Sequence, residues 1–134
     1  MANGADIARR PIGVFDSGLG GLTVVRRIME RLAGEDIVYL GDSARVPYGI
    51  KSPETVQKFA VEDAGFLRRF DPKLIVVACN TASAVALEAL REAMDVEVVG
   101  VVAPAAAAAL ALAADGPVGV IGTEGTITSG AYQR

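Results

Sequence analysis

A chain of 134 residues is long enough for one ordinary domain, and 51% of its residues are hydrophobic, mostly Ala, Val, Leu and Ile without any Trp. The net charge of −3 offers no basic patch for nucleic acid, and no apolar run approaches the ~20 residues that cross a bilayer. A single Cys excludes an internal disulfide and indicates a reducing, cytoplasmic setting, while the absence of His excludes catalytic triads, His-ligated zinc and imidazole bases.

Apolar runs of strand length alternate with helical segments along the chain. Residues 1–10 are polar and lack the apolar core of a signal peptide, so we expect a loose, disordered tail there. The expected strands are residues 12–15, 36–40, 74–78, 96–102 and 118–121, and the expected helices are residues 22–32, 53–70, 84–93 and 105–114. This alternation with short links predicts an α/β fold with a doubly wound parallel sheet.

Two of these helices have clear start signals. Ser52-Pro53-Glu54 places a capping residue, a proline at the first helical position and an acid in the first turn. A mostly apolar stripe follows at helical spacing, and Asp63 is the charged residue within it. The Ala-rich helix is expected to begin at Pro104 and to end at residues 115–117.

Polar and glycine-rich segments follow four of the predicted strands. They are residues 16–21, 41–49, 79–81 and 122–126. Ligands bind at the carboxyl ends of the strands in such sheets, so we expect these loops to meet at one edge and form a site. Any one loop alone would be weak evidence.

Cys79 ends the third predicted strand and precedes a helix that Asn80, Thr81 or Ser83 can cap. A thiol there would face unpaired backbone N–H groups and the positive end of the helix dipole, which favour the thiolate. The alternative interpretation is a buried cysteine that packs as a small hydrophobe. The three polar residues behind Cys79 favour a site.

The loop at residues 16–21 only superficially resembles a phosphate loop, because Thr23 stands where the dinucleotide fingerprint needs its third glycine. One interpretation is a close-approach turn whose N–H groups and Ser17 hold a carboxylate, while Asp16 meets an ammonium group or assists proton transfer. The other is a tight strand–helix turn capped by Asp16, and on this segment alone the two are about equally supported.

Residues of the remaining loops also allow two interpretations each. Arg45 can clamp an anion or be a solvated loop charge, and Tyr48-Gly49 after Pro47 can be simple turn chemistry. Thr123 and Thr126 can be ligand hydroxyls, or a helix N-cap and its neighbour.

Taken together, the loop motifs resemble the cofactor-independent aspartate/glutamate racemase family, and its glutamate-specific members in particular. The order and spacing hold from about Pro11 to the last residue. The matching segments are Asp16–Val24, Gly41–Gly49, Ala78–Ser83, Gly122–Ile127 and Ser129–Tyr132.

The resemblance implies interconversion of L- and D-glutamate for bacterial peptidoglycan, by two cysteines on opposite faces of the α-carbon, with no cofactor and no metal. It assigns Cys79 as the cysteine that faces the α-hydrogen of D-glutamate and Asp16 as the acid that assists it. The residues that correspond to substrate-binding positions are Asp16, Ser17, Tyr48, Gly49, Asn80, Thr81, Thr123 and Thr126.

The chain departs from the family pattern because it holds neither a second Cys nor any His. We therefore expect the N-terminal half of a longer protein: a tail at residues 1–10, a flavodoxin-like racemase domain at 11–98, and the start of a second, similar domain at 99–134. The 134-residue chain alone is then expected to be inactive as a racemase. The full-length protein is expected to bind glutamate, to form a homodimer and to contact neither nucleic acid nor membrane.

Two alternatives remain open on the residues alone. One is an inactive amino-acid-binding or regulatory fragment. The other is a related racemase or isomerase that acts on aspartate, a hydantoin or maleate, although the motifs at residues 16–24 and 41–49 favour glutamate.

Overall fold

The computed structural model of the chain describes residues 4–113 and 116–134 and contains one parallel sheet in the order β2–β1–β3–β4. The strands are β1 (Ile12–Asp16), β2 (Ile37–Gly41), β3 (Leu74–Val77) and β4 (Glu97–Gly100). The helices are α1 (Gly4–Ala8), α2 (Leu22–Arg31), α3 (Pro53–Leu67), α4 (Asn80–Val85), α5 (Leu87–Ala93), α6 (Val102–Leu112) and α7 (Glu124–Thr128), with 3-10 turns η1 (Tyr48–Ile50) and η2 (Arg68–Phe70). The expected α/β class is confirmed.

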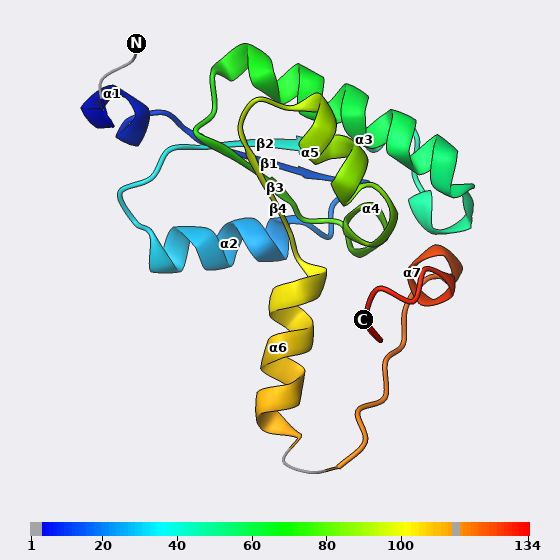
Figure 1. The fold of residues 1–134 in the computed structure, drawn as a ribbon. Helices are drawn as coiled ribbons and strands as arrows, with labels where there is room; N and C mark the ends of the chain where they lie inside the picture. Colours follow the sequence, from blue (N-terminus) through cyan, green and yellow to red (C-terminus); the bar gives the residue numbers. More distant parts are fainter. Residues whose placement is uncertain (1–3, 114–115) are drawn as a thin grey trace.

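Helices cover both faces of the sheet, as a doubly wound fold requires. Figure 1 shows α2 on one face and α3 and α5 on the other. The α3 side holds the larger core, in which Val56, Ala60 and Leu67 are fully buried against Phe15 and other strand residues. The core on the α2 side is smaller, and no residue of α2 is itself fully buried in it.

The strand order places a crevice between β1 and β3. The chain leaves β1 for β2 on one side and then crosses to β3 on the other side, so the loops after β1 and β3 diverge. Such a switch point at the carboxyl ends of parallel strands is where open α/β sheets bind ligands. The two loops are residues 16–21 and 79–81.

Helix α3 begins as its start signals predict. The Ser52 hydroxyl accepts from the backbone N–H of Thr55 at 3.3 Å, and Pro53 occupies the first helical position. Asp63 lies on the buried face with 3% of its surface exposed.

The helix expected at residues 84–93 begins earlier and is broken. Asn80 already starts α4, and Ala86, with φ −117° and ψ −4°, separates it from α5. Gln57 of α3 donates from Nε2 to the carbonyl of Val85 at 2.9 Å and so takes an acceptor that a continuous helix would use.

Helix α6 also begins earlier than expected, at Val102, which shortens the strand predicted to reach that residue. Pro104 therefore stands inside the first turn, where its missing N–H costs no intrahelical hydrogen bond. Helix α6 ends at Leu112 with Ala113 as its C-cap, earlier than the expected end at residues 115–117, of which residue 115, like residue 114, lies outside the described residues.

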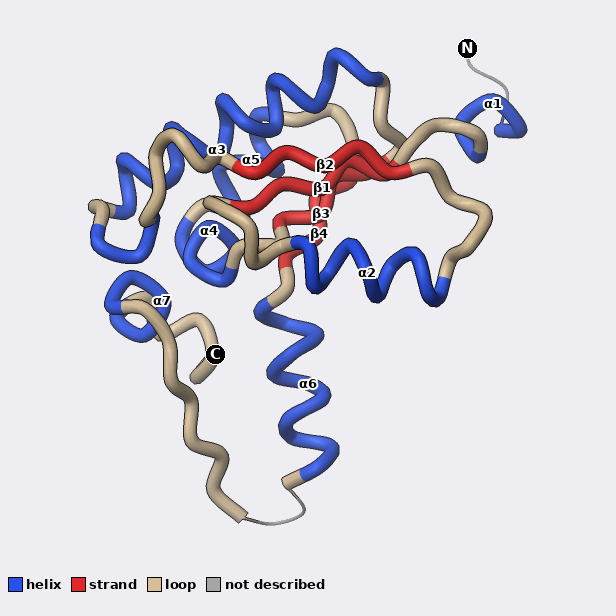
Figure 2. Tube along the Cα trace, turned by 180° about the vertical axis from the view of Figure 1, so that it is seen from behind, coloured by secondary structure: helices blue, strands red, loops and turns tan. Residues whose placement is uncertain are grey.

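The fifth strand predicted at residues 118–121 is wrong: the segment carries no strand, and Ile121 is 99% exposed. The 11 residues of α6 carry the chain about 16 Å along the helix axis. Figures 1 and 2 show α6 extending away from the sheet, with the next segment returning toward α7. Within the described residues no strand pairs with the outer edge of β4, so the apolar run has no ladder to join.

The loose tail expected at residues 1–10 also needs correction, because residues 4–8 form α1. Two contacts tether this end of the chain: Lys73 donates to the carbonyl of Ala8 at 2.8 Å, and Arg10 pairs with Asp71 at 3.0 Å. Residues 1–3 lie outside the described part of the chain. None of the helices described is long and apolar enough to span a membrane.

The expected domain division after residue 98 falls within β4, which pairs with β3 through Glu97–Gly100. The division itself stays a prediction.

Candidate functional site

A cavity of about 380 Å³ lies at the switch point between β1 and β3. Its lining comes from the loops after these two strands, from the starts of α2 and α6 and from the segment around α7. The lining residues are Asp16, Ser17, Gly20, Thr23, Val24, Ala78, Cys79, Asn80, Thr81, Val101, Ala105, Thr123 and Tyr132. Three of the four expected loops, at residues 16–21, 79–81 and 122–126, therefore meet at this sheet edge, and the last reaches it without a preceding strand. The loop at residues 41–49 does not line the cavity, which corrects the expectation for that loop.

Cys79 stands two residues after the end of β3, with 6% of its surface exposed. The backbone N–H of Ala78 donates to the carbonyl of Phe15 at 2.8 Å, which ties the end of β3 to β1. Cys79 itself is the N-cap of α4, because its Sγ accepts from the N–H of Ala82 at 3.4 Å. The expectation that Asn80, Thr81 or Ser83 caps this helix was wrong, since these side chains bond elsewhere.

Ser17 brings the loop after β1 to the thiol. Its hydroxyl oxygen lies 3.3 Å from Cys79 Sγ, where the thiol donates; a thiolate at the same position would accept from the hydroxyl. The segment at residues 16–21 and the segment at residues 79–81 thus meet through a direct side-chain contact.

Asp16 supports the loop and also faces the cavity. Its Oδ2 accepts from the N–H groups of Gly18 at 3.2 Å and Gly21 at 2.9 Å, as the turn-capping interpretation predicts. A Cβ at Gly21 would lie 2.5 Å from Asp16 Cβ, so only glycine allows α2 to start this close to the carboxylate. The Asp16 side chain therefore both caps the turn and lines the cavity.

Tyr39 of β2 also contacts the loop at residues 16–21, a role that was not predicted from the sequence. Tyr39 donates to the carbonyl of Gly18 at 3.1 Å. Burial, and then the charge of Asp16, raise the pKa of Tyr39, which keeps its hydroxyl protonated as a donor. Gly41 leaves room for this contact, because a Cβ there would lie 2.2 Å from the Gly18 carbonyl oxygen.

Three threonine hydroxyls join α7 to α4 beside the cavity. Thr81 Oγ1 lies 2.8 Å from Thr123 Oγ1 and 3.3 Å from Thr126 Oγ1. Thr123 caps α7 by accepting from the N–H of Thr126, so the capping interpretation of this pair holds. Thr123 also lines the cavity, whereas Thr126 is 2% exposed and lines a smaller neighbouring space of about 200 Å³.

Tyr132 is a cavity residue that the sequence analysis did not single out, although it stands in one of the matching motifs. Its hydroxyl donates to Asn80 Oδ1 at 2.6 Å. This bond leaves the amide N–H groups of Asn80 available to a ligand.

Tyr48 does not enter the cavity. The side chain is 1% exposed, and its hydroxyl contacts the carboxylates of Asp42 and Asp63, the latter at 2.8 Å. Arg45, expected as an anion clamp or a solvated charge, pairs instead with Asp42 at 2.6 Å and Asp63 at 2.7 Å, and also with Glu62. The guanidinium lies 4.4 Å from the ring centre of Phe59.

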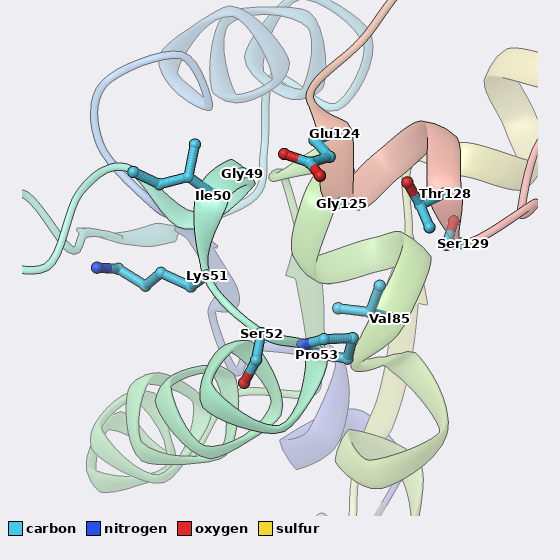
Figure 3. Close-up of a pocket in the computed structure, with 10 residues that line it drawn as sticks. All are labelled: Gly49, Ile50, Lys51, Ser52, Pro53, Val85, Glu124, Gly125, Thr128 and Ser129. Atoms are coloured by element: carbon cyan, nitrogen blue, oxygen red, sulfur yellow. The ribbon is translucent and has the colours of Figure 1, made fainter.

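Gly49 connects this buried cluster to α7. A Cβ at Gly49 would lie 2.4 Å from Thr123 Cβ, so the backbone of η1 touches the cap of α7. Figure 3 shows Gly49 and Gly125 close to each other at a second cavity, of about 330 Å³, between the start of α3 and α7. Of the eight predicted substrate-binding residues, Tyr48, Gly49 and Thr126 therefore do not line the Cys79 cavity.

The arrangement suits proton transfer on a small polar ligand. It combines a thiol, a carboxylate and several hydroxyl and amide donors in a crevice that is open to solvent on one side. Among residues 4–113 and 116–134, no three side chains of His, Cys, Asp or Glu meet in a way that would hold a metal ion.

The chain is similar to known proteins of one family. Residues 12–134 match the model of the Asp/Glu/Hydantoin racemase family. A glutamate racemase from Geobacter metallireducens is 58% identical over 93% of this chain, which corresponds to 46% of that relative.

Two solved structures are also similar. The glutamate racemase of Bacillus anthracis superposes with a TM-score of 0.89 at 51% identity, covering 92% of this chain and 47% of its own. That of Francisella tularensis, solved with D-glutamate, gives 0.84 at 48% identity, covering 93% and 47%. The chain spans about half the length of the curated relatives it matches.

Proposed function

The chain belongs to the Asp/Glu/Hydantoin racemase family, and on that premise we propose that it supplies one half of the active site of a glutamate racemase. The relatives at 50–58% identity are glutamate racemases, and one of the similar structures contains D-glutamate. In this proposal the chain is the N-terminal half of a longer enzyme that interconverts L- and D-glutamate.

One observation carries the proposal. Cys79 Sγ lies 3.3 Å from Ser17 Oγ in the cavity that Asp16, Asn80 and Thr81 also line. A thiol, a carboxylate and donors for a carboxylate ligand are the groups that cofactor-independent removal of an α-hydrogen needs.

The proposed chemical step is a proton transfer to Cys79. The thiolate takes the α-hydrogen of D-glutamate, an S–H bond forms, and the electron pair of the broken C–H bond spreads into the α-carboxylate. Ser17 donates to the thiolate before the transfer, and Asp16 assists the proton movement. The amide of Asn80 and the hydroxyl of Thr81 stabilise the negative charge that develops on the ligand.

The remaining predicted residues bind substrate or support those that do. Thr123 presents its hydroxyl to the cavity, and Thr126 holds Thr81 and Thr123 in place. Tyr48 is buried, so we propose that this motif contributes through the backbone of Tyr48 and Gly49.

Inversion needs an acid on the opposite face of the α-carbon, because a single base returns its proton to the side from which it came. Cys79 is the only cysteine of this sequence. We therefore place the second acid in the part of the protein to which the other half of the relatives corresponds.

We also propose a cytoplasmic enzyme that supplies D-glutamate for peptidoglycan and, at full length, a homodimer. A reducing compartment keeps the Cys79 thiol free. The similarity to glutamate racemases supports the peptidoglycan role.

Proton NMR of glutamate in deuterated buffer tests the assignment. The isolated 134-residue chain should invert neither enantiomer, but it should exchange the α-hydrogen of D-glutamate for deuterium with retention of configuration. Cys79→Ser should abolish this exchange, because an alkoxide is inaccessible near neutral pH. Ser43→Ala, at an exposed residue outside the cavity, should exchange at the wild-type rate.

Two results would refute the assignment. One is an exchange rate in Cys79→Ser equal to that of the wild-type chain. The other is inversion of either enantiomer by the pure chain, which would show that one thiol is enough. D-Aspartate in the same assay separates glutamate specificity from a broader racemase.

A further inference from the structure

Asp63 is a buried titratable residue that the proposed mechanism does not use. It lies on α3, away from the Cys79 cavity, with 3% of its surface exposed. Its Oδ1 accepts from Arg45 Nη2 at 2.7 Å, and its Oδ2 lies 2.8 Å from the hydroxyl of Tyr48. The same hydroxyl contacts Asp42 Oδ2, which also accepts from Arg45 Nε at 2.6 Å.

The protons of this cluster can be counted. Tyr48 has one hydroxyl proton, but its oxygen contacts two carboxyl groups, so one contact lacks a proton if Asp42 and Asp63 are both ionised. If Asp63 carries a proton, it donates to the Tyr48 oxygen, and Tyr48 donates to Asp42. Arg45 still donates to both acids, and every contact then has its proton.

The charges favour the same arrangement. One guanidinium faces Asp42 and Asp63, and Glu62 pairs with it from outside. Burial and, after it, the charge of Asp42 raise the pKa of Asp63 to about 6, against the lowering effects of Tyr48 and Arg45. Burial and the neighbouring acids also raise the pKa of Tyr48, so the phenol keeps its proton.

The cluster is linked to the cavity through adjacent residues. Tyr48 is followed by Gly49, whose backbone packs so closely on Thr123 that a Cβ would lie 2.4 Å from Thr123 Cβ. Thr123 Oγ1 in turn lies 2.8 Å from Thr81 Oγ1, and both threonines line the cavity. A change in the hydrogen bonds of Tyr48 can therefore displace the hydroxyls of Thr123 and Thr81, which both line the cavity.

We propose that Asp63 is a positioning residue whose proton completes the Tyr48 cluster, holds Gly49 against Thr123 and so sets the Thr81 and Thr123 hydroxyls for the ligand. This role rests on the proposed function of the Cys79 cavity. The titratable or charged groups that face Asp63 in the structure are Asp42, Arg45 and Tyr48, with Glu62 acting through Arg45. D-Glutamate binds more tightly when Asp63 carries its proton.

A pH titration followed by amide NMR tests the link. The chain has no His, so few other side chains titrate near neutral pH. In the wild-type chain the amides of Gly49 and Thr123 should shift together with a midpoint of about 6. Asp63→Asn should remove this step.

Two further variants control the experiment. Glu62→Gln changes a neighbouring acid that pairs with the same Arg45 but does not contact Tyr48, so it should keep the step, with a lower midpoint. Tyr48→Phe removes the shared hydroxyl and should uncouple Gly49 from the titration, which keeps the proposal testable if Asp63→Asn fails to fold. Gly49 and Thr123 amides that do not shift in the wild-type chain would overturn the proposal.

Affinity for D-glutamate, measured on both sides of the midpoint, tests the consequence for the site. The wild-type affinity should fall as the pH rises through the midpoint, and the affinity of Asp63→Asn should not. A step in the amide shifts together with a pH-independent affinity would overturn the positioning role. If the Gly49 and Thr123 amides titrate but neither the wild-type chain nor any variant binds D-glutamate, the proposed function is refuted. The claim that Asp63 affects ligand affinity is then refuted too, and only the structural link from Asp63 to Thr123 stands.

Discussion

Replacing Gly49 by Ala tests whether the contact between η1 and α7 organises the site. The backbone of Gly49 is not in the left-handed region, so alanine can adopt its conformation and the effect is purely steric. The added Cβ would lie 2.4 Å from Thr123 Cβ and 2.5 Å from its Cγ2, whereas ordinary contact begins at 3.4 Å. Thr123 must therefore move by about 1 Å, since the clash involves the Cβ and not only a flexible tip.

The energetic cost follows from this displacement. Overpacking of this kind costs about 1–3 kcal/mol. A shift of about 1 Å also breaks the 2.8 Å contact between Thr81 and Thr123, at roughly 1 kcal/mol. We expect Gly49→Ala to lower the free energy of unfolding by about 2–4 kcal/mol in total.

Urea unfolding followed by circular dichroism measures this change, and amide NMR of Thr123 reports the displacement. Gly65→Ala is the matched control, because Gly65 is an exposed position inside α3 where an added Cβ meets nothing within 4 Å. There, alanine should stabilise the chain by up to about 1 kcal/mol. Wild-type stability of Gly49→Ala with an unshifted Thr123 amide would show that the contact does not constrain the site.

Three other predictions concern stability, ligand binding and association. Burial raises the pKa of Asp63 from 3.8, its ordinary value in the unfolded chain, to about 6 in the folded chain. Below pH 3.8 the side chain is protonated in both states, so its contribution to the free energy of unfolding is fully present. As the pH rises from there through about 6 the unfolded chain loses this proton first, and that contribution is lost. The free energy of unfolding of the wild-type chain relative to Asp63→Asn should thus fall by up to about 3 kcal/mol between about pH 4 and 7, and equal pH profiles in urea unfolding would contradict this. Tyr132→Phe removes the donor to Asn80 and should weaken D-glutamate binding about 3- to 10-fold in an NMR titration without changing the urea midpoint; unchanged affinity would show that Tyr132 does not orient Asn80. Leu112 and Ile121 are 87% and 99% exposed, so the chain should self-associate with rising concentration in light scattering, and the double change Leu112→Lys and Ile121→Lys should reduce this; a concentration-independent wild-type monomer would contradict it.

Local chemistry along the chain was enough to predict much of the fold. Ser52 starts α3 by accepting from the N–H of Thr55, and Pro53 has no N–H that needs a partner, so this signal needs no distant residue. Parallel strands share one carboxyl edge, so the positions of Asp16 and Cys79 after their strands already predicted that they line one cavity. The sequence also placed Asp63 in the apolar stripe of α3, and a carboxylate there needs a buried partner.

Other features depended on residues far apart in the sequence. The partners of Tyr48 and Arg45 include Asp63, which only the packing of α3 brings to them. Gln57 breaks the helix after Val85, and the apolar run at residues 118–121 forms no strand because no described neighbour offers it a ladder. Hydrophobic periodicity indicates which face a segment buries, and capping residues indicate the hydrogen bonds that a segment makes with itself. Strand pairing, buried ion pairs and close glycine contacts instead depend on what lies across the interface, and only the tertiary structure decides that.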